Sequence, residues 1–353
     1  AYQCESGTVA EPLTDDECLR VLELYERFGN QREAAEAMGI PRTTFHNRMV
    51  AAKKRLGPNP KIEPPAVFPT FPDDDVDAEE ILDHMERRFE KRQAREKAEH
   101  WFAINEPTNE PIAYSWFGDP HLGSNGCNIK LLRRDIEIIK STPGLMAANC
   151  GDTVDGWGGS LVRLYADNDV SRQTERRLAR WFLEEAGIPW RLWLLGNHDV
   201  MDGSLVAYLE GINAHRVPMV DWRARFRVVF PNGCEIKIDA AHDHKGSSIY
   251  NPLHGQKRAS LWDEDADIYI AGHRHNWALA SEEVAGGRVI NMCRARGYKY
   301  LDEFARRRNY VIQQTGASIV TVFDPVTTSP VRRVQCFADV EAGADYLTWL
   351  RSK

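Results

Sequence analysis

Short runs of apolar residues recur through the last two thirds of the chain, and a polar segment follows each run. The runs are Ile112–Phe117, Leu145–Cys150, Arg191–Leu195, Ile236–Ala241 and Ile268–Ala271. Runs of this length that end at turn residues predict buried β-strands, and all but one stop at a glycine. Because loops at the carboxyl ends of strands hold the ligand site in α/β folds, we expect the polar segments to form a site.

The first 57 residues have helical spacing instead. Thr14-Asp15-Asp16-Glu17 has the form of a capping box, and the apolar positions of the helix it opens end at Gly29. Asn30 is expected to cap a second helix, Gln31–Met38, and a glycine turn leads into a third, Arg42–Leu56. This succession of a short helix, a turn and a helix resembles a DNA-binding helix-turn-helix domain, here residues 1–57.

Charge supports DNA binding by this domain. From Ala37 to Gly57 there is no acidic residue. The side chains expected to contact DNA are Arg42, Thr43, Thr44, His46, Asn47, Arg48, Lys53, Lys54 and Arg55. Donors at the start of a helix and cations along it can meet base edges and phosphates. The alternatives are a three-helix bundle with a solvated basic face and one that binds protein. The net charge of −7 does not decide, since binding depends on the local patch.

Residues 58–77 are predicted to be a linker. Six prolines fall within residues 58–72, which favours an extended, semi-rigid spacer. A highly charged helix near Ala78–Phe102, in a connecting segment 78–104, then carries a thin apolar stripe of Ile81, Met85 and Phe89, later joined by Trp101 and Phe102. We expect this helix to lie on the catalytic domain, residues 105–353, with one side in water. A two-stranded coiled coil is the alternative.

The polar segments after the predicted strands combine carboxylate, amide and imidazole groups. They are Gly118-Asp119-Pro120-His121, Gly151-Asp152-Thr153-Val154-Asp155, Gly196-Asn197-His198-Asp199, Ala241-His242-Asp243-His244 and Gly272-His273-Arg274-His275. Hard divalent cations prefer oxygen ligands, and borderline cations also accept imidazole nitrogen. The set predicts divalent metal ions, with manganese expected and iron, zinc and nickel as alternatives.

The order D-x-H, GDxxD, GNHD, H, GHxH resembles the calcineurin-like metallophosphoesterase superfamily, over about residues 112–324. The resemblance implies an α/β fold, a four-layer α-β-β-α sandwich, with two metals. One metal would be held by Asp119, His121 and His275, the other by Asn197, His242 and His273, and Asp152 would bridge both. The loop after Ala241 could present either His242 or His244. The first is preferred, which leaves His244 behind the ligands or facing substrate.

Such a site can activate a shared water for in-line attack on phosphorus, while an imidazole held in one tautomer assists the leaving alkoxide. The resemblance assigns that imidazole to His198, oriented by Asp155. The sequence contains no GxSxG elbow, GxxxxGK[ST] loop or GxGxxG fingerprint that would indicate other chemistry.

Residues around the motifs bear on the substrate. The ending His-Leu-Gly of the first motif is similar to the double-strand-break-repair exonuclease branch, and the arginine that follows GDxxD in the phosphatase branch is absent. Trp157 could stack on a base, with packing as the alternative. Arg294, Arg296 and Lys299, followed by Arg306-Arg307-Arg308, could follow a phosphate backbone, with a solvated face as the alternative.

We therefore expect a nuclease that hydrolyses DNA phosphodiester bonds and docks on duplex through its N-terminal domain. The alternatives are an enzyme that cleaves small or cyclic nucleotides and, less favoured, a non-catalytic DNA-binding regulator. The short stretch after GHxH suits a standalone nuclease of the kind found in phages. Seven scattered cysteines without CxxC spacing, no signal pattern and no long apolar run predict a cytoplasmic protein without a membrane partner, and leave a homodimer open.

Overall fold

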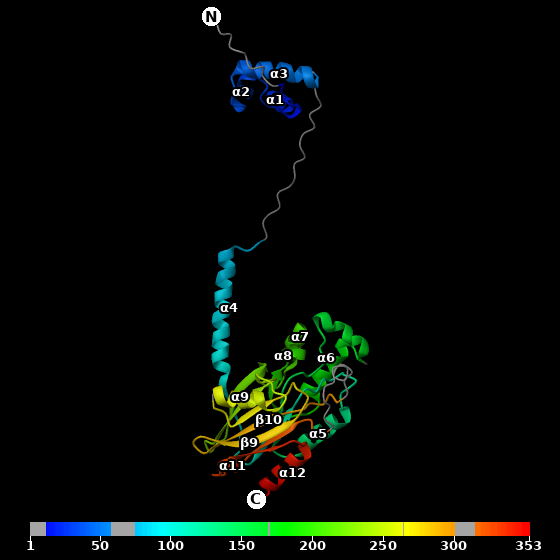
Figure 1. Cartoon of the computed structure of the whole chain (residues 1–353), viewed down its shortest axis with the longest axis vertical. Helices are drawn as coiled ribbons and strands as arrows, with labels where there is room; N and C mark the ends of the chain where they lie inside the picture. Colours follow the sequence, from blue (N-terminus) through cyan, green and yellow to red (C-terminus); the bar gives the residue numbers. More distant parts are fainter. Residues whose placement is uncertain (1–11, 58–74, 169, 264, 301–314) are drawn as a thin grey trace. The chain divides into compact units, whose positions relative to one another are not determined.

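The computed structural model describes residues 12–57, 75–168, 170–263, 265–300 and 315–353. The chain forms two compact units, Ala1–Ala78 and Glu79–Lys353, and each is described by itself. Figure 1 shows the elements of both units. The proline-rich segment 58–72 and Arg306-Arg307-Arg308 lie outside the described residues. Among the described residues, no helix is both long and apolar enough to cross a bilayer.

The N-terminal unit contains the three predicted helices, α1 (Asp15–Phe28), α2 (Gln31–Ala37) and α3 (Arg42–Leu56). The predicted capping box is present, because Thr14 Oγ1 accepts a hydrogen bond from Glu17 N and the Glu17 carboxylate accepts one from Thr14 N. Asn30 caps α2 by accepting from two backbone N–H groups. One face of each helix is buried in a small core that consists of Cys18, Val21, Leu22, Ala34, Ala35, Phe45, Met49 and Ala52.

The charged helix α4 (Ala78–Glu99) ends earlier than predicted. Trp101 and Phe102 belong to strand β1 (His100–Asn105), and the Phe102 ring stacks on that of Phe226 at 5.6 Å. Cross-strand pairing of aromatic side chains therefore overrides the helical continuation. All of α4 is described, and none of its residues is buried; Met85 and Phe89 are each 59% exposed. The prediction that the apolar stripe packs on the catalytic domain is wrong.

Two six-stranded sheets form the centre of the second unit. The first has the order β12-β11-β2-β3-β4-β5 and consists of β2 (Ile112–Phe117), β3 (Leu145–Asn149), β4 (Trp190–Leu195), β5 (Met219–Asp221), β11 (Ile319–Phe323) and β12 (Val334–Phe337). The second has the order β1-β6-β7-β8-β10-β9 and includes β6 (Arg223–Val229), β7 (Glu235–Ala241), β8 (Ile268–Ala271), β9 (Ala278–Val284) and β10 (Arg288–Arg294). All the predicted strands are confirmed to within one residue at each end.

The sheets pack face to face and helices cover their outer faces. Trp116 and Leu194 of the first sheet share one core with Phe226 and Ile238 of the second. Outside the first sheet lie α5 (Ile129–Ser141), α6 (Arg172–Arg180), the π-helical turn Trp181–Glu185, α8 (Gly203–Ile212) and α12 (Val340–Arg351), and outside the second lies α9 (His254–Trp262). Three short helices, Gly159–Asp167, α7 (Asn197–Met201) and α11 (Pro330–Arg333), complete the unit. The expected α-β-β-α sandwich is confirmed.

Candidate metal centre

The predicted ligands follow the carboxyl ends of strands in both sheets. In the first sheet β2, β3 and β4 are parallel, and in the second β7 and β8 are parallel. Parallel neighbours end at the same edge of a sheet, so the loops that follow them meet. The side chains on these loops are Asp119 and His121 after β2, Asp152 after β3, Asn197 after β4, His242 after β7, and His273 and His275 after β8.

One group of these side chains surrounds His242. Its Nε2 atom is 3.3 Å from Asp152 Oδ2, 3.0 Å from Asn197 Oδ1 and 3.0 Å from His273 Nδ1. The Nδ1 atom of His242 donates to the main-chain oxygen of Cys150 at 2.8 Å. A carbonyl bonded in this way fixes the tautomer and leaves Nε2 as the free ligand atom, which is the usual support of a metal-bound histidine.

A second group lies beside the first. His121 Nε2 is 3.3 Å from His275 Nε2 and 3.9 Å from Asp152 Oδ2, while Asp119 Oδ2 is 3.8 Å from His275 Nε2. Asp152 is the residue that approaches both groups. The structure thus brings all seven predicted ligands together, and their coordination of metal stays a prediction.

The carboxylate of Asp119 provides a test of whether this donor set fits a cation. Asp119 is fully buried, and neither of its oxygens has a hydrogen-bond partner among the described residues. Burial raises the pKa of Asp119 well above its ordinary value. A buried carboxylate without a partner is costly, and a bound cation would remove that cost. The donor set therefore fits a divalent metal.

Backbone conformation marks the same residues. Five of the predicted ligands are non-glycine residues with left-handed φ angles: Asp119 (36°), His121 (44°), Asp152 (52°), His273 (68°) and His275 (50°). Each such residue costs on the order of 1–3 kcal/mol and persists where the surrounding structure holds it in place. The glycines before them are needed for close approach. A Cβ atom on Gly196 would overlap the Asp152 carboxylate, and one on Gly151 would lie 2.8 Å from His242 Nδ1.

The charge states of the imidazoles suit ligation. Burial lowers the pKa of His121 to about 4, with the Lys299 ammonium adding to the effect, and burial beside His242 lowers that of His273 to about 4. Both rings are neutral near pH 7, which is the form that binds metal. Burial also disfavours the charged form of His242, but the Asp152 and Asp119 carboxylates outweigh it and raise its pKa to about 10. A cation at this position would take the place of that proton.

The choice between His242 and His244 follows from their partners. His244 is 2% exposed, and its Nε2 atom lies 3.2 Å from Asp239 Oδ1, whose carboxylate also binds Arg223. The imidazole therefore belongs to a buried ion-pair network behind the strand ends. The expectation that His244 faces substrate is wrong, because its side chain is enclosed.

His198 contacts Asp155, although through a different atom than the resemblance suggests. The Nδ1 atom of His198 lies 2.5 Å from the main-chain oxygen of Asp155. The Asp155 carboxylate is instead 2.8 Å from His121 Nδ1 and 2.9 Å from Lys299 Nζ, because those two groups can donate to it. Since a carbonyl only accepts, His198 carries a proton on Nδ1, and Nε2 is the atom free to exchange one.

The other residues predicted to contact substrate are buried. Arg294 is 2% exposed and Arg296 is 1% exposed. Arg294 donates to the Asp243 carboxylate and to the main-chain oxygens of Gly272 and Pro252. The prediction of an accessible basic stretch is wrong for these residues, since their charges hold loops together. Trp157 is 8% exposed and packs edge-on against His198 at 4.7 Å, in line with the packing alternative.

Two residues near the centre were not singled out from the sequence. Asp199 is fully buried and accepts from Thr153 N and Gly196 N, each at 2.9 Å, so it joins two of the ligand loops. Trp222 is 40% exposed, has a left-handed φ of 59°, and its ring lies 5.1 Å from that of His242. Asp199 was within the GNHD motif, whereas Trp222 is far from any motif and only the fold places it here.

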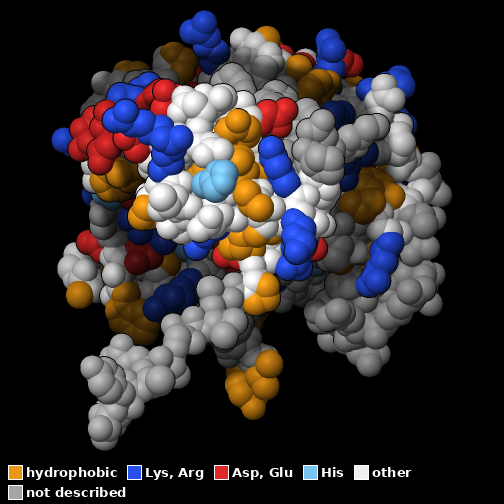
Figure 2. All heavy atoms as spheres, turned by 90° about the horizontal axis from the view of Figure 1, so that it is seen from above, with side chains coloured by type: hydrophobic (Ala, Val, Ile, Leu, Met, Phe, Trp, Pro, Cys, Tyr) orange, Lys and Arg blue, Asp and Glu red, His pale blue; other side chains and the backbone are white. Residues whose placement is uncertain are grey.

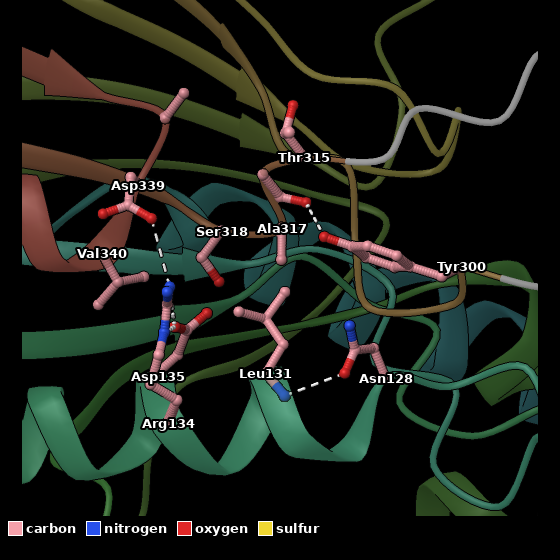
Figure 3. Close-up of a pocket in the computed structure, with 12 residues that line it drawn as sticks. Asn128, Leu131, Arg134, Asp135, Tyr300, Thr315, Ala317, Ser318, Asp339 and Val340 are labelled. Atoms are coloured by element: carbon pink, nitrogen blue, oxygen red, sulfur yellow. Dashed lines mark hydrogen bonds and ion pairs between the residues drawn. The ribbon is translucent and has the colours of Figure 1, made fainter.

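A separate cavity of about 310 Å³ lies beside α5. Figure 3 shows its polar groups paired with one another: Arg134 with Asp339, and Tyr300 with the main-chain oxygen of Gly316. None of the predicted metal ligands, all of which are described, lines this cavity. It therefore belongs to the scaffold and serves below as a place for control substitutions.

No protein family model and no curated protein sequence matches the chain. Among solved structures, it is similar to Haemophilus influenzae NAD nucleotidase (NadN), with 12% identity and a TM-score of 0.37 over 64% of this chain and 49% of that one. The 5'-nucleotidase precursor from Thermus thermophilus gives 11%, 0.36, 69% and 58%. GAP50, the anchor in the inner membrane complex of Plasmodium, gives 10%, 0.33, 68% and 94%. The chain spans about half the length of the two nucleotidases. At these identities, the argument for activity rests on the site.

Proposed function

We propose that the chain is a divalent-metal-dependent phosphoesterase that hydrolyses phosphate esters of nucleosides. The observation that carries this proposal is the convergence of seven oxygen and imidazole donors on Asp152, with the partnerless Asp119 carboxylate among them. Two adjacent cations at such a site would supply an activated water and neutralise charge on phosphoryl oxygens. Manganese is the proposed metal, because borderline cations accept this mixture of donors.

The protein's own residues have defined parts in this proposal. Asp119, His121 and His275 would hold one cation, Asn197, His242 and His273 the other, and Asp152 both. His198 Nε2 would deliver a proton to the leaving oxygen, because its Nδ1 atom is held by the carbonyl of Asp155. His198 N also donates to Asp152 Oδ1 at 2.9 Å, which fixes the imidazole beside the centre.

DNA is a second candidate substrate, favoured by α3. Phe45, Met49 and Ala52 bury one side of this helix, while Arg42, Thr43, His46, Asn47, Lys53 and Lys54 are exposed on the rest. Cations and hydrogen-bonding groups on one free face suit a nucleic-acid backbone. Arg55 is less available, because its guanidinium pairs with Asp15 at 2.5 Å. On the face drawn in Figure 2, Lys and Arg side chains form separate groups rather than one continuous surface.

The test is hydrolysis by metal-stripped protein after addition of Mn, Mg or Zn. Substrates are bis-p-nitrophenyl phosphate, a nucleoside 5'-phosphate ester, and labelled linear, circular and single-stranded DNA. We expect the small diesters to be cleaved when a transition metal is present. Cleavage of DNA as well would favour the nuclease. No hydrolysis of any phosphate ester with any of the metals would refute the proposed function.

A further inference from the structure

A cavity of about 610 Å³ adjoins the proposed metal centre and belongs to no motif. It is formed by the segment between β7 and α9, by Arg274 and Asn276 from the loop after β8, and by Arg294 at the end of β10. Arg274 stands between the predicted ligands His273 and His275 in the chain, so the cavity and the centre share that loop. Its volume is in the range of small-molecule sites, roughly 300–1,000 Å³.

The wall on the side of the metal centre is positively charged and held in place. Arg274 Nη2 and Arg294 Nη1 bind the Asp243 carboxylate at 2.6 Å and 3.2 Å. Two guanidinium groups on one carboxylate leave an excess of positive charge. The ten residues that line the cavity are all described, and none of them is acidic. A wall of this kind favours a ligand that carries an anionic phosphate group.

Away from this wall the lining is neutral and has hydrogen-bonding capacity. The Oδ1 atom of Asn276 is buried and has no hydrogen-bond partner among the described residues. Ser247 and Asn251 add further polar groups, and Ile249, which is 90% exposed, supplies an apolar surface. A carboxamide offers both an acceptor and donors, which is the combination that reads the edge of a nucleobase, and an apolar side chain can cover the face of the ring.

We propose that this cavity binds the base of a nucleoside phosphate ester, with Asn276 hydrogen-bonded to the edge of the base. The inference rests on the proposed function, since the phosphate would lie at the metal centre beyond Arg274. It adds a substrate class, because a cavity that holds one base selects nucleosides over simple alkyl or aryl esters. Trp222 lies on the other side of Asp243, whose main-chain oxygen its Nε1 atom contacts at 3.1 Å, and is not needed for this recognition.

The experiment compares two substrates that release the same p-nitrophenol: thymidine 5'-p-nitrophenyl phosphate, which has a base, and bis-p-nitrophenyl phosphate, which has none. For Asn276→Ala we expect KM for the thymidine ester to rise about 3–10-fold with kcat unchanged, the usual scale of one hydrogen bond. Kinetics with bis-p-nitrophenyl phosphate should stay the same. Asn109→Ala, an exposed substitution outside the cavity, is the matched control.

A second variant and a binding measurement keep the test decisive. Ser247→Trp should fill the mouth of the cavity and weaken binding of thymidine 5'-monophosphate, measured by calorimetry, at least as much as Asn276→Ala does. Equal changes of KM for both substrates, or thymidine monophosphate binding that neither variant alters, would overturn the inference. Failure of the proposed function looks different: no ester is hydrolysed by any variant or by the unaltered chain, although the monophosphate can still bind.

Discussion

The helices α1–α3 and the proposed metal centre use polar residues in opposite ways. In the helical unit, polar side chains cap helix ends at the surface, as Thr14 and Asn30 do, and the left-handed turn residues are glycines such as Gly29. In the metal centre, carboxylates such as Asp119 and Asp152 are buried, and ligands themselves are in the left-handed region. Local sequence is enough to form the first region. The second exists only because two packed sheets hold strained loops together.

The largest effect that can break this comparison is expected for Asp152→Asn. Asp152 approaches both groups of predicted ligands, so the change should reduce the affinity for both cations. Because metal-ion catalysis is worth several kcal/mol, turnover of bis-p-nitrophenyl phosphate should fall by at least about 10³-fold. Elemental analysis and kinetics measure the two effects.

Asp135→Asn is the matched control for this change. Asp135 is also buried, but it lies by the cavity of Figure 3, where it accepts from Tyr298 Oη at 2.8 Å. Its substitution should lower stability without changing the metal content per folded chain. Full metal occupancy in Asp152→Asn would sink the bridging assignment.

His198→Ala is expected to have the next largest effect, and it separates binding from chemistry within the centre. The imidazole is predicted to transfer a proton rather than to hold metal, so kcat should fall by about 10²–10⁴-fold while metal content stays nearly intact. His215→Ala, at a histidine whose side chain is 72% exposed, should change neither quantity. If His198→Ala loses one cation instead, the residue is a ligand and its assigned role is wrong.

The two regions also differ in what their sequences predict. Capping residues and apolar spacing are local, so α1–α3 and the five strands could be predicted to within a residue or so. The ligand set came from the order of the motifs, and the structure brings it together. Partners distant in sequence could not be predicted. Lys299 draws the Asp155 carboxylate away from His198, and Arg294 is buried by a contact with Asp243. Both depend on which loops the sheets bring together.

Deletion of residues 1–57 tests whether the two regions act on the same substrate. The deletion removes α3 and no predicted metal ligand, so hydrolysis of bis-p-nitrophenyl phosphate should change less than about twofold. If DNA is the substrate, its cleavage should weaken about tenfold or more at moderate salt. The slope of log affinity against log salt should become shallower by about 0.9 for each lost phosphate contact with duplex. Cleavage of DNA equal to that of the full chain at every salt concentration would leave small nucleotides as the preferred substrates.

The smallest expected effect comes from the N-terminal cap of α1. Thr14→Ala removes the acceptor for Glu17 N and should lower the stability of the α1–α3 unit by about 1 kcal/mol. Native-state hydrogen exchange of the α1 amides measures this locally, and Thr43→Ala, at an exposed position in the first turn of α3, is the matched control. Activity on the small diester should not change. A loss of that activity in Thr14→Ala would show that the helical unit supports the metal centre, and the contrast between a self-sufficient region and a strained one would fail.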